Sequence, residues 1–258
     1  MNPFDLPVRY HRFFPGDAPL GFTHKTLTID PTSTTLLLVD VYHAAETPQG
    51  KELVNSGFDR RWWEIVNTNL APLLSTARAI GLPIVYVNNS SPHIAINQSA
   101  FGRRLNESLG FDPTIDFKER EVNPLEFDQG EPVQLFFPPN IAPREGDYFI
   151  RKHTYSGFFE TRLDSVLRNL GTKTLLCAGF VADCCILFTL ADAVFRGYDT
   201  ILFRDCTLAA ELPSEIENLT QTNRTIMWIE SILAPTTTTP EFLRKCNSAN
   251  TTEISQDG

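Results

Sequence analysis

The sequence contains no hydrophobic run that approaches the roughly 18 residues needed to cross a membrane. Its first thirty residues also lack the apolar stretch of a secretory signal. We therefore expect a cytoplasmic protein with no membrane partner. The Asn-x-Ser/Thr triplets at Asn97 and Asn218 are then interpreted as chance matches to the glycosylation pattern.

Basic residues are outnumbered, with 22 Lys and Arg against 31 Asp and Glu, which gives a net charge of −9. This balance argues against binding to nucleic acid or to an anionic membrane. The chain has 258 residues, of which 42% are hydrophobic. It can therefore bury a large core without disulfides or a structural metal, as one α/β domain or, less readily, two small ones.

Cysteine is scarce, and its pattern excludes a disulfide framework. The number is odd and no C-x-x-C occurs; the five are Cys177, Cys184, Cys185, Cys206 and Cys246. Most of them lie in apolar runs. We interpret Cys177 and Cys206 as small buried hydrophobic residues.

Short apolar, β-branched runs alternate with segments of helical periodicity along most of the chain. The runs predict strands at 34–41, 83–87, 148–150, 173–180 and 200–203. The periodic segments predict helices at 59–80, 161–170, 185–196 and 215–232. This alternation predicts a three-layer α/β/α fold around a mostly parallel, doubly wound, Rossmann-like sheet.

Three segments of the chain are distinguished by composition. Residues 1–30 are a proline-rich arm in which 24–29 is expected to form a short edge strand, packing over the domain or onto a second subunit. Residues 31–235 form the main domain, and residues 236–258 form a polar tail. Within the domain, 99–143 is irregular, and we interpret it as a lid, a substrate loop or plain surface.

Polar residues follow several of the predicted strands. Asp40, Asn88, Lys152 and the turn 180–185 all lie at carboxyl ends of strands. In a parallel sheet these ends meet at one edge, where the ligand crevice forms. We therefore expect these four positions, which are far apart in the sequence, to converge on one site.

The residue types at these ends suit nucleophilic catalysis. A cysteine at a helix N-terminus, here Cys185, is favoured as a thiolate, and Lys152 is expected to lower its pKa. Asp40 can take the thiol proton and return it to a leaving amine. Each has a simpler interpretation: Cys185 as packing, Asp40 as a cap, and Lys152 as a solvent-exposed charge.

The segment GFVADCCILFTLADAVFRGYD resembles the nucleophile motif of the isochorismatase-like cysteine hydrolases. Aligned so, the family's nucleophile falls on Cys185 and not on Cys184. LLLVDVY matches the strand that bears the catalytic Asp, here Asp40, and the lysine matches at Lys152. The resemblance runs from about 34 to 207, and further matches are Thr189, Asp192, Ala193, Gly197 and Tyr198.

Within that family, KHTYSGFFETRLDSVLRNLG resembles the ureidoacrylate amidohydrolase branch. The resemblance implies hydrolysis of a C–N bond in a ureido, carbamoyl or small amide substrate, through a thioacyl-enzyme, with release of ammonia or carbamate. It also implies a cis peptide at Val181-Ala182, an oxyanion hole formed by the N–H groups of Ala182 and Cys185, and a dimer or tetramer.

The sequence departs from the family pattern near the expected pocket. Asp-x-Gln is replaced by Asp40-Val41-Tyr42, and the small residue and the Thr of the turn are replaced by Val181 and Ala182. Candidate substrate contacts are Tyr42, His43, Asn88, Tyr155 and Phe158. Simple packing or a capping hydrogen bond is the alternative for each.

Two other activities stay open at this stage. One is an isochorismatase-type vinyl ether hydrolase, but that branch lacks the cysteine that Cys185 supplies here. The other is a non-catalytic binding protein of the same fold. The Asp-x-His pair of the metal-dependent relatives is absent and His43 and His93 are isolated, so we expect a site with no metal and no cofactor.

Overall fold

The computed structural model describes residues 2–18, 20–46, 54–90 and 100–109, and residues 135–254. In this part of the chain eight strands form one sheet in the order β2-β1-β8-β7-β6-β3-β4-β5. The strands are β1 Phe4–Arg12, β2 Gly21–Ile29, β3 Thr34–Val39, β4 Ile84–Asn89, β5 Tyr148–Lys152, β6 Thr174–Gly179, β7 Asp199–Phe203 and β8 Thr236–Thr237. Strands β3 to β8 pair in parallel, and the β1–β2 hairpin joins antiparallel.

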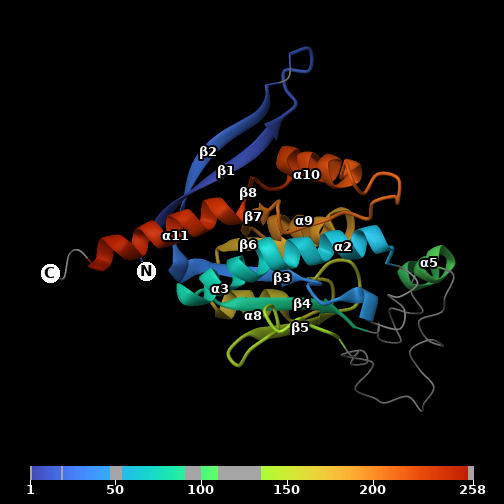
Figure 1. Ribbon diagram of the computed structural model, residues 1–258, viewed down its shortest axis with the longest axis horizontal. Helices are drawn as coiled ribbons and strands as arrows, with labels where there is room; N and C mark the ends of the chain where they lie inside the picture. Colours follow the sequence, from blue (N-terminus) through green and yellow to red (C-terminus); the bar gives the residue numbers. More distant parts are fainter. Residues whose placement is uncertain (1, 19, 47–53, 91–99, 110–134, 255–258) are drawn as a thin grey trace.

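Helices cover both faces of the sheet, as Figure 1 shows. They are α2 Ser56–Ile65, η3 Val66–Leu70, α3 Ala71–Ala79, α5 Ala100–Leu109, α8 Leu163–Asn169, η4 Ala182–Ile186, α9 Leu187–Phe195, α10 Thr220–Ile232 and α11 Thr239–Ile254, with short 3-10 turns η1 Pro31–Ser33 and η2 Ala44–Glu46. One apolar core lies under α2, α3 and α11, and a second lies under α8 and α9. The expected three-layer α/β/α fold is confirmed. None of the described helices has the length and apolarity that crossing a bilayer requires.

The sheet is doubly wound about its centre. From β3 the chain moves to β4 and β5 on one side, and it later returns to β6 and β7 on the other side. Asp40 therefore follows β3, and the turn that carries Cys185 follows β6, its immediate neighbour. This reversal of strand order opens a crevice at the carboxyl ends of the two strands.

Gly179 fixes how closely these two strands approach. Its φ of +128° is a conformation that side chains rarely adopt, and a Cβ there would lie 1.9 Å from the carbonyl oxygen of Val39. Directly after it, the Phe180 N–H donates to the same Val39 carbonyl at 2.8 Å. The glycine thus lets β6 turn away while it stays hydrogen-bonded to β3.

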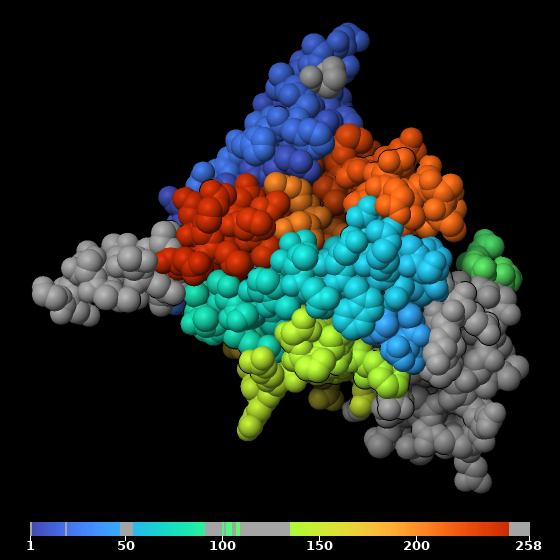
Figure 2. Space-filling view, in the orientation of Figure 1, coloured from blue at the N-terminus to red at the C-terminus, as the bar shows by residue number. Residues whose placement is uncertain are grey.

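The two ends of the chain contain structure that the sequence analysis missed. The expected edge strand 24–29 is the second half of the hairpin β1–β2, which projects from the body in Figure 2. The buried side chains of Phe4, Leu6 and Val8 alternate with more exposed ones, as a strand requires. The expected polar tail contains the short strand β8 and the sixteen-residue helix α11.

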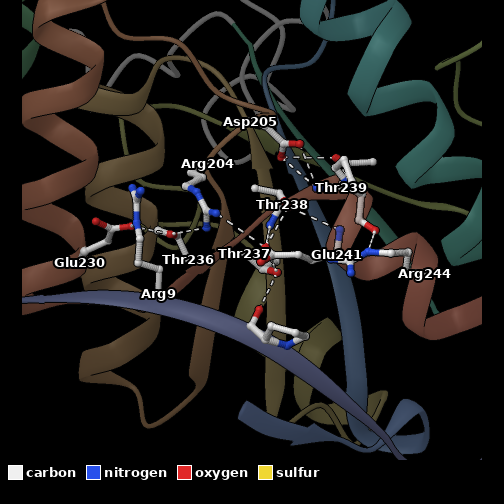
Figure 3. A network of polar contacts seen from close by, with 12 residues as sticks. Arg9, Arg204, Asp205, Glu230, Thr236, Thr237, Thr238, Thr239, Glu241 and Arg244 are labelled. Carbon is white, nitrogen blue, oxygen red and sulfur yellow. Dashed lines mark hydrogen bonds and ion pairs between the residues drawn. The ribbon is translucent and has the colours of Figure 1, made fainter. Parts of the chain in front are cut away.

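A buried polar network attaches the hairpin to the domain, as Figure 3 shows. Arg9 on β1 donates to the Glu230 carboxylate on α10 at 2.8 Å, and Thr236 on β8 donates to the same oxygen at 2.5 Å. Arg204, which follows β7, reaches the Thr236 hydroxyl at 3.2 Å. Because the Glu230 side chain is fully buried, its charge depends on these partners.

Candidate active site

Asp40 occupies the first residue after β3 and turns the chain there. Its φ of +48° is unusual for a residue other than glycine, and its N–H donates to Val87 on the neighbouring strand at 2.9 Å. The carboxylate is 7% exposed and accepts from the Asn89 N–H at 2.8 Å. The turn therefore holds the Asp40 carboxylate across the end of β4.

Lys152 is the last residue of β5, and its side chain is completely buried. Its ammonium nitrogen lies 2.8 Å from the Asp40 carboxylate and 3.2 Å from the Cys185 sulfur. It also donates to the side-chain oxygen of Asn89 and, at 3.3 Å, to the Thr154 carbonyl. These acceptors compensate the charge that burial takes out of water.

Cys185 lies in the first turn of the helical segment that begins after β6. It is 7% exposed, and its sulfur faces Lys152. Cys184 is more accessible and lies to one side, where it is hydrogen-bonded with Tyr155. The three side chains that the sequence analysis selected as a triad therefore meet at one point, and the cysteine that meets the lysine is Cys185.

Lys152 lowers the pKa of the Cys185 thiol, as expected, but other neighbours oppose this effect. A hydrogen bond with Cys184 and burial raise the pKa of the Cys185 thiol well above its ordinary value, and Lys152 only partly opposes them. For Lys152 itself, burial lowers the pKa, but Asp40 and Cys185 outweigh burial and raise it. The buried ammonium group of Lys152 is thus paired with Asp40, and its effect on the thiol is opposed by Cys184 and by burial.

The turn after β6 corrects two details of the expected oxyanion hole. The cis peptide is Phe180-Val181, one residue before the expected Val181-Ala182. The Ala182 N–H donates to the Leu208 carbonyl at 2.9 Å, so this donor is already occupied. The Cys185 N–H, in the first turn of a helix, remains the candidate donor to an oxyanion.

A cavity of about 290 Å³ opens beside the sulfur of Cys185. Aromatic and aliphatic side chains line part of it, and polar residues that follow β3, end β4 or lie on other segments line the rest. Its lining consists of Asp40, Tyr42, His43, Ala44, Ala45, Val54, Asn55, Phe58, Asp59, Trp62, Asn89, Phe180, Val181, Cys185, Ala210 and Glu211. A small substrate in this cavity would reach both Asp40 and Cys185.

Two of the five expected substrate contacts line this cavity. Tyr42 is hydrogen-bonded to the Asn89 amide at 2.9 Å, and burial and then Asp40 raise the pKa of its phenol. His43 stacks on Trp62 with ring centroids 4.8 Å apart, and its Nε2 lies 2.6 Å from Asp59. The sequence analysis did not anticipate Asp59, because its pairing with His43 arises only when α2 packs over the end of β3.

Asn88 is not at the site; its neighbour Asn89 is. Successive residues of a strand face opposite sides of the sheet, so only one of the two can point at Asp40 and Lys152. Asn88 is fully buried, and neither of its amide atoms has a polar partner among the described residues. Asn89 contacts Asp40, Tyr42 and Lys152, which makes it the functional position that sequence reasoning missed.

The remaining two candidates lie outside the cavity lining. Phe158 is buried in the core, beside the ring of Tyr198 and under the guanidinium of Arg196. Tyr155 stacks on Phe188 with ring centroids 5.7 Å apart, on the Cys184 side of the turn. Packing is therefore the better interpretation of Phe158, because its ring is buried against Tyr198 and Arg196.

Three residues that match the family motif, Thr189, Asp192 and Tyr198, hold the segment after Lys152 in place beside α9 and α8. The Thr189 hydroxyl accepts from the Gly157 N–H at 3.0 Å, and Asp192 accepts from the Ser156 hydroxyl. Tyr198 donates to Asp164 at 2.8 Å, at the start of α8. These contacts fix the chain that follows Lys152, so they are supporting interactions.

Metal-ligating side chains do not gather in the described part of the chain: no three His, Cys, Asp or Glu residues there are placed to hold one ion. His43 is engaged with Asp59. His93 lies outside the described residues.

Comparison with known proteins identifies the family of the chain. Residues 35–231 match the model of the isochorismatase domain. A cysteine hydrolase from Pseudomonas syringae pv. phaseolicola 1448A is 26% identical, covering 86% of this chain and 95% of that one, with a TM-score of 0.60.

Two further structures share the fold at lower identity. An isochorismatase from Pseudomonas putida KT2440 is 21% identical over 82% of this chain and 91% of its own, with a TM-score of 0.53. An isochorismatase family protein from Burkholderia thailandensis is 19% identical over 83% and 94%, with a TM-score of 0.52. With the family model matching most of its length, the chain belongs to the isochorismatase family of hydrolases.

Proposed function

We propose that this protein is a cysteine-dependent amidohydrolase that cleaves a C–N bond of a ureido, carbamoyl or small amide substrate. The observation that carries the proposal is the convergence of Asp40, Lys152 and Cys185 beside one cavity. Their chemistry is a nucleophile, a proton acceptor and a fixed positive charge, which acyl transfer from an amide requires. The similarity to a cysteine hydrolase at 26% identity supports the same class.

The first step is attack by Cys185 on the substrate carbonyl. A hydrogen bond with Cys184 and burial raise the pKa of the Cys185 thiol, so a base must take its proton as the C–S bond forms. Asp40 accepts that proton, and Lys152, 3.2 Å from the sulfur, stabilises the thiolate as it forms. The carbonyl oxygen becomes an oxyanion, for which the Cys185 N–H is the candidate donor.

The second step is breakdown of the tetrahedral intermediate. Asp40 returns the proton to the nitrogen, the C–N bond breaks, and ammonia or an amine leaves with a thioacyl group remaining on Cys185. Water then attacks this thioester, with Asp40 as base, and the product acid is released. When the substituted amine of a ureido substrate leaves first, the released acid is carbamic acid, which decomposes to carbon dioxide and ammonia.

The test is an ammonia-release screen over ureido acids, aryl and alkyl ureas, biuret-type compounds and primary amides. Cys185→Ala is the matched negative control, because it removes only the sulfur. Release from at least one class by the wild-type protein, lost in Cys185→Ala, supports the proposal. Release that Cys185→Ala retains would overturn it, and a pyruvate assay on isochorismate tests the vinyl ether alternative.

A further inference from the structure

The cavity beside Cys185 has an unusual balance of charge. Among the described residues that line it there are three carboxylates, Asp40, Asp59 and Glu211, and no lysine or arginine. Lys152 is adjacent, but its ammonium group is buried against Asp40 and is engaged there. Within the described lining, a substrate carboxylate would therefore find no basic side chain apart from His43, which already faces Asp59.

Two of the three carboxylates are already satisfied by the protein. Asp40 is paired with Lys152 and accepts from the Asn89 N–H. Glu211 accepts from the N–H groups of Gln221 and Thr222, at 3.1 and 2.7 Å, and so caps the first turn of α10. Neither carboxylate needs a substrate to complete its hydrogen bonds.

Asp59 is different. One of its oxygens lies 2.6 Å from the Nε2 of His43, and among the described residues no side-chain donor contacts the other oxygen. The side chain is 35% exposed, at the lining of the cavity. Asp59 therefore has the capacity to accept a hydrogen bond from a ligand, and its position is fixed because His43 is held between Trp62 and Trp63.

Much of the remaining lining is apolar, with polar groups from Tyr42, Asn55 and Asn89. Trp62 lies against Phe180 with ring centroids 6.0 Å apart, and Phe58 and Val181 extend the same wall. Such a wall suits a flat, apolar group and gives an anion no compensation for lost water. An aromatic face also attracts a cation, which Asp59 would then pair with.

We infer that this cavity selects amide or ureido substrates whose non-reacting part is flat, apolar and either uncharged or cationic, with a hydrogen-bond donor directed at Asp59. A carboxylate on that part of the substrate is disfavoured. This inference rests on the proposed function for the reacting group, but it concerns a separate element, the Asp59–His43 pair. It makes Asp59 a specificity-determining residue.

Matched electrophiles test the cavity without requiring turnover. N-benzyl-2-iodoacetamide is compared with its 4-carboxy and 4-aminomethyl derivatives, and the rate of Cys185 alkylation is followed by mass spectrometry at fixed pH. The carboxylated probe is expected to react at least about tenfold more slowly than the parent, because like charges oppose it. The aminomethyl probe is expected to react at least as fast as the parent.

Variants assign the effect to Asp59. In Asp59→Asn the advantage of the aminomethyl probe over the carboxylated probe is expected to shrink by about tenfold or more, whereas Glu64→Gln leaves it unchanged. Glu64 is the matched control, since it lies on the same helix, outside the lining, and bonds to Arg60 and Arg61.

Equal or faster alkylation by the carboxylated probe would overturn the inference, as would an unchanged preference in Asp59→Asn. Failure of the ammonia-release screen leaves this result intact, because alkylation reports recognition and the screen reports hydrolysis. The two ideas can therefore fail separately.

Discussion

The ammonium group of Lys152 donates a hydrogen bond to the sulfur of Cys185 across 3.2 Å, although the two residues come from strands that are not neighbours. Strands β3 and β4 lie between β5 and β6. With strands about 4.8 Å apart, the two backbones are separated by three spacings, or about 14 Å. The long side chain of Lys152 and the turn that carries Cys185 back over the sheet close this gap.

Replacement of Cys185 by serine is expected to lower the rate of ammonia release by at least about a thousandfold, since a hydroxyl is a much weaker nucleophile in this setting. Cys184→Ala is the matched control and is expected to keep activity within about tenfold of wild type. Rates are measured on the best substrate of the screen. A larger loss in Cys184→Ala than in Cys185→Ser would contradict the assignment of the nucleophile.

The Asp40–Lys152 pair is expected to show strong coupling in a double-mutant cycle. Lys152→Met leaves the Asp40 carboxylate buried without its cation and is expected to reduce the free energy of unfolding by about 3–5 kcal/mol. Adding Asp40→Asn removes the unpaired charge and is expected to recover much of that loss. Urea unfolding gives the free energies.

Activity distinguishes the two roles of this pair. All three variants of the cycle are expected to be inactive in ammonia release, including the restabilised double variant, because both charges act in the reaction. Simple additivity of the two unfolding effects would show that the pair is not coupled.

The free energy of unfolding is expected to fall at alkaline pH, because the buried cysteine thiols ionise more readily in the unfolded chain than in the folded protein. Burial raises the pKa of Cys177 to about 12 from an ordinary value of 9.0. Above pH 9 the unfolded chain therefore loses this proton while the folded protein keeps it. The stabilisation is complete below pH 9 and is lost toward pH 12, by up to about 1.4 kcal/mol per pH unit for each such thiol.

Cys177→Val isolates this contribution, because the side chains are similar in volume. The slope of unfolding free energy against pH between 9 and 11 is expected to be shallower in the variant than in the wild type. Urea melts at half-unit intervals measure it. Identical slopes would mean that the thiol ionises in the folded protein as readily as in the unfolded chain.

Gly179→Ala is expected to cost more than about 3 kcal/mol or to prevent folding, since the added Cβ would overlap the Val39 carbonyl and the φ of +128° would be strained. Gly16→Ala is the control, because no atom lies within 4 Å of the position that an added Cβ would take, and it is expected to change stability by less than about 0.5 kcal/mol. Chemical unfolding of both variants measures the change in the free energy of unfolding. A small change for Gly179→Ala would show that β3 and β6 can separate locally.

Much of this arrangement could be predicted because it depends on local patterns. Buried runs such as 34–41 predicted the central strands, and the position of Asp40, Lys152 and Cys185 at strand ends follows from topology. The hairpin was missed because Pro7 lies within the alternation of Phe4, Leu6 and Val8, and because contacts with the distant elements β8, α10 and α11 hold it in place.

Other details depend on contacts between segments that are far apart in the sequence. Whether Asn88 or Asn89 points at the site depends on which side chains of β4 lie on each face of the sheet. The occupied N–H of Ala182 depends on Leu208, and the pairing of His43 depends on the packing of α2. The raised pKa of Cys185 likewise depends on a hydrogen bond with Cys184 and on burial, which residue types alone do not report.

The network around Glu230 makes the N-terminal hairpin and the C-terminal segment depend on each other. Arg9 and Thr236 share one carboxylate oxygen, and the Thr237 hydroxyl donates to the Pro7 carbonyl. Deleting the first thirty residues to obtain a shorter protein would therefore strip the counter-ion from a buried acid and uncover one edge of β8. Anyone trimming this protein for crystallisation should retain both ends, or replace Glu230 at the same time.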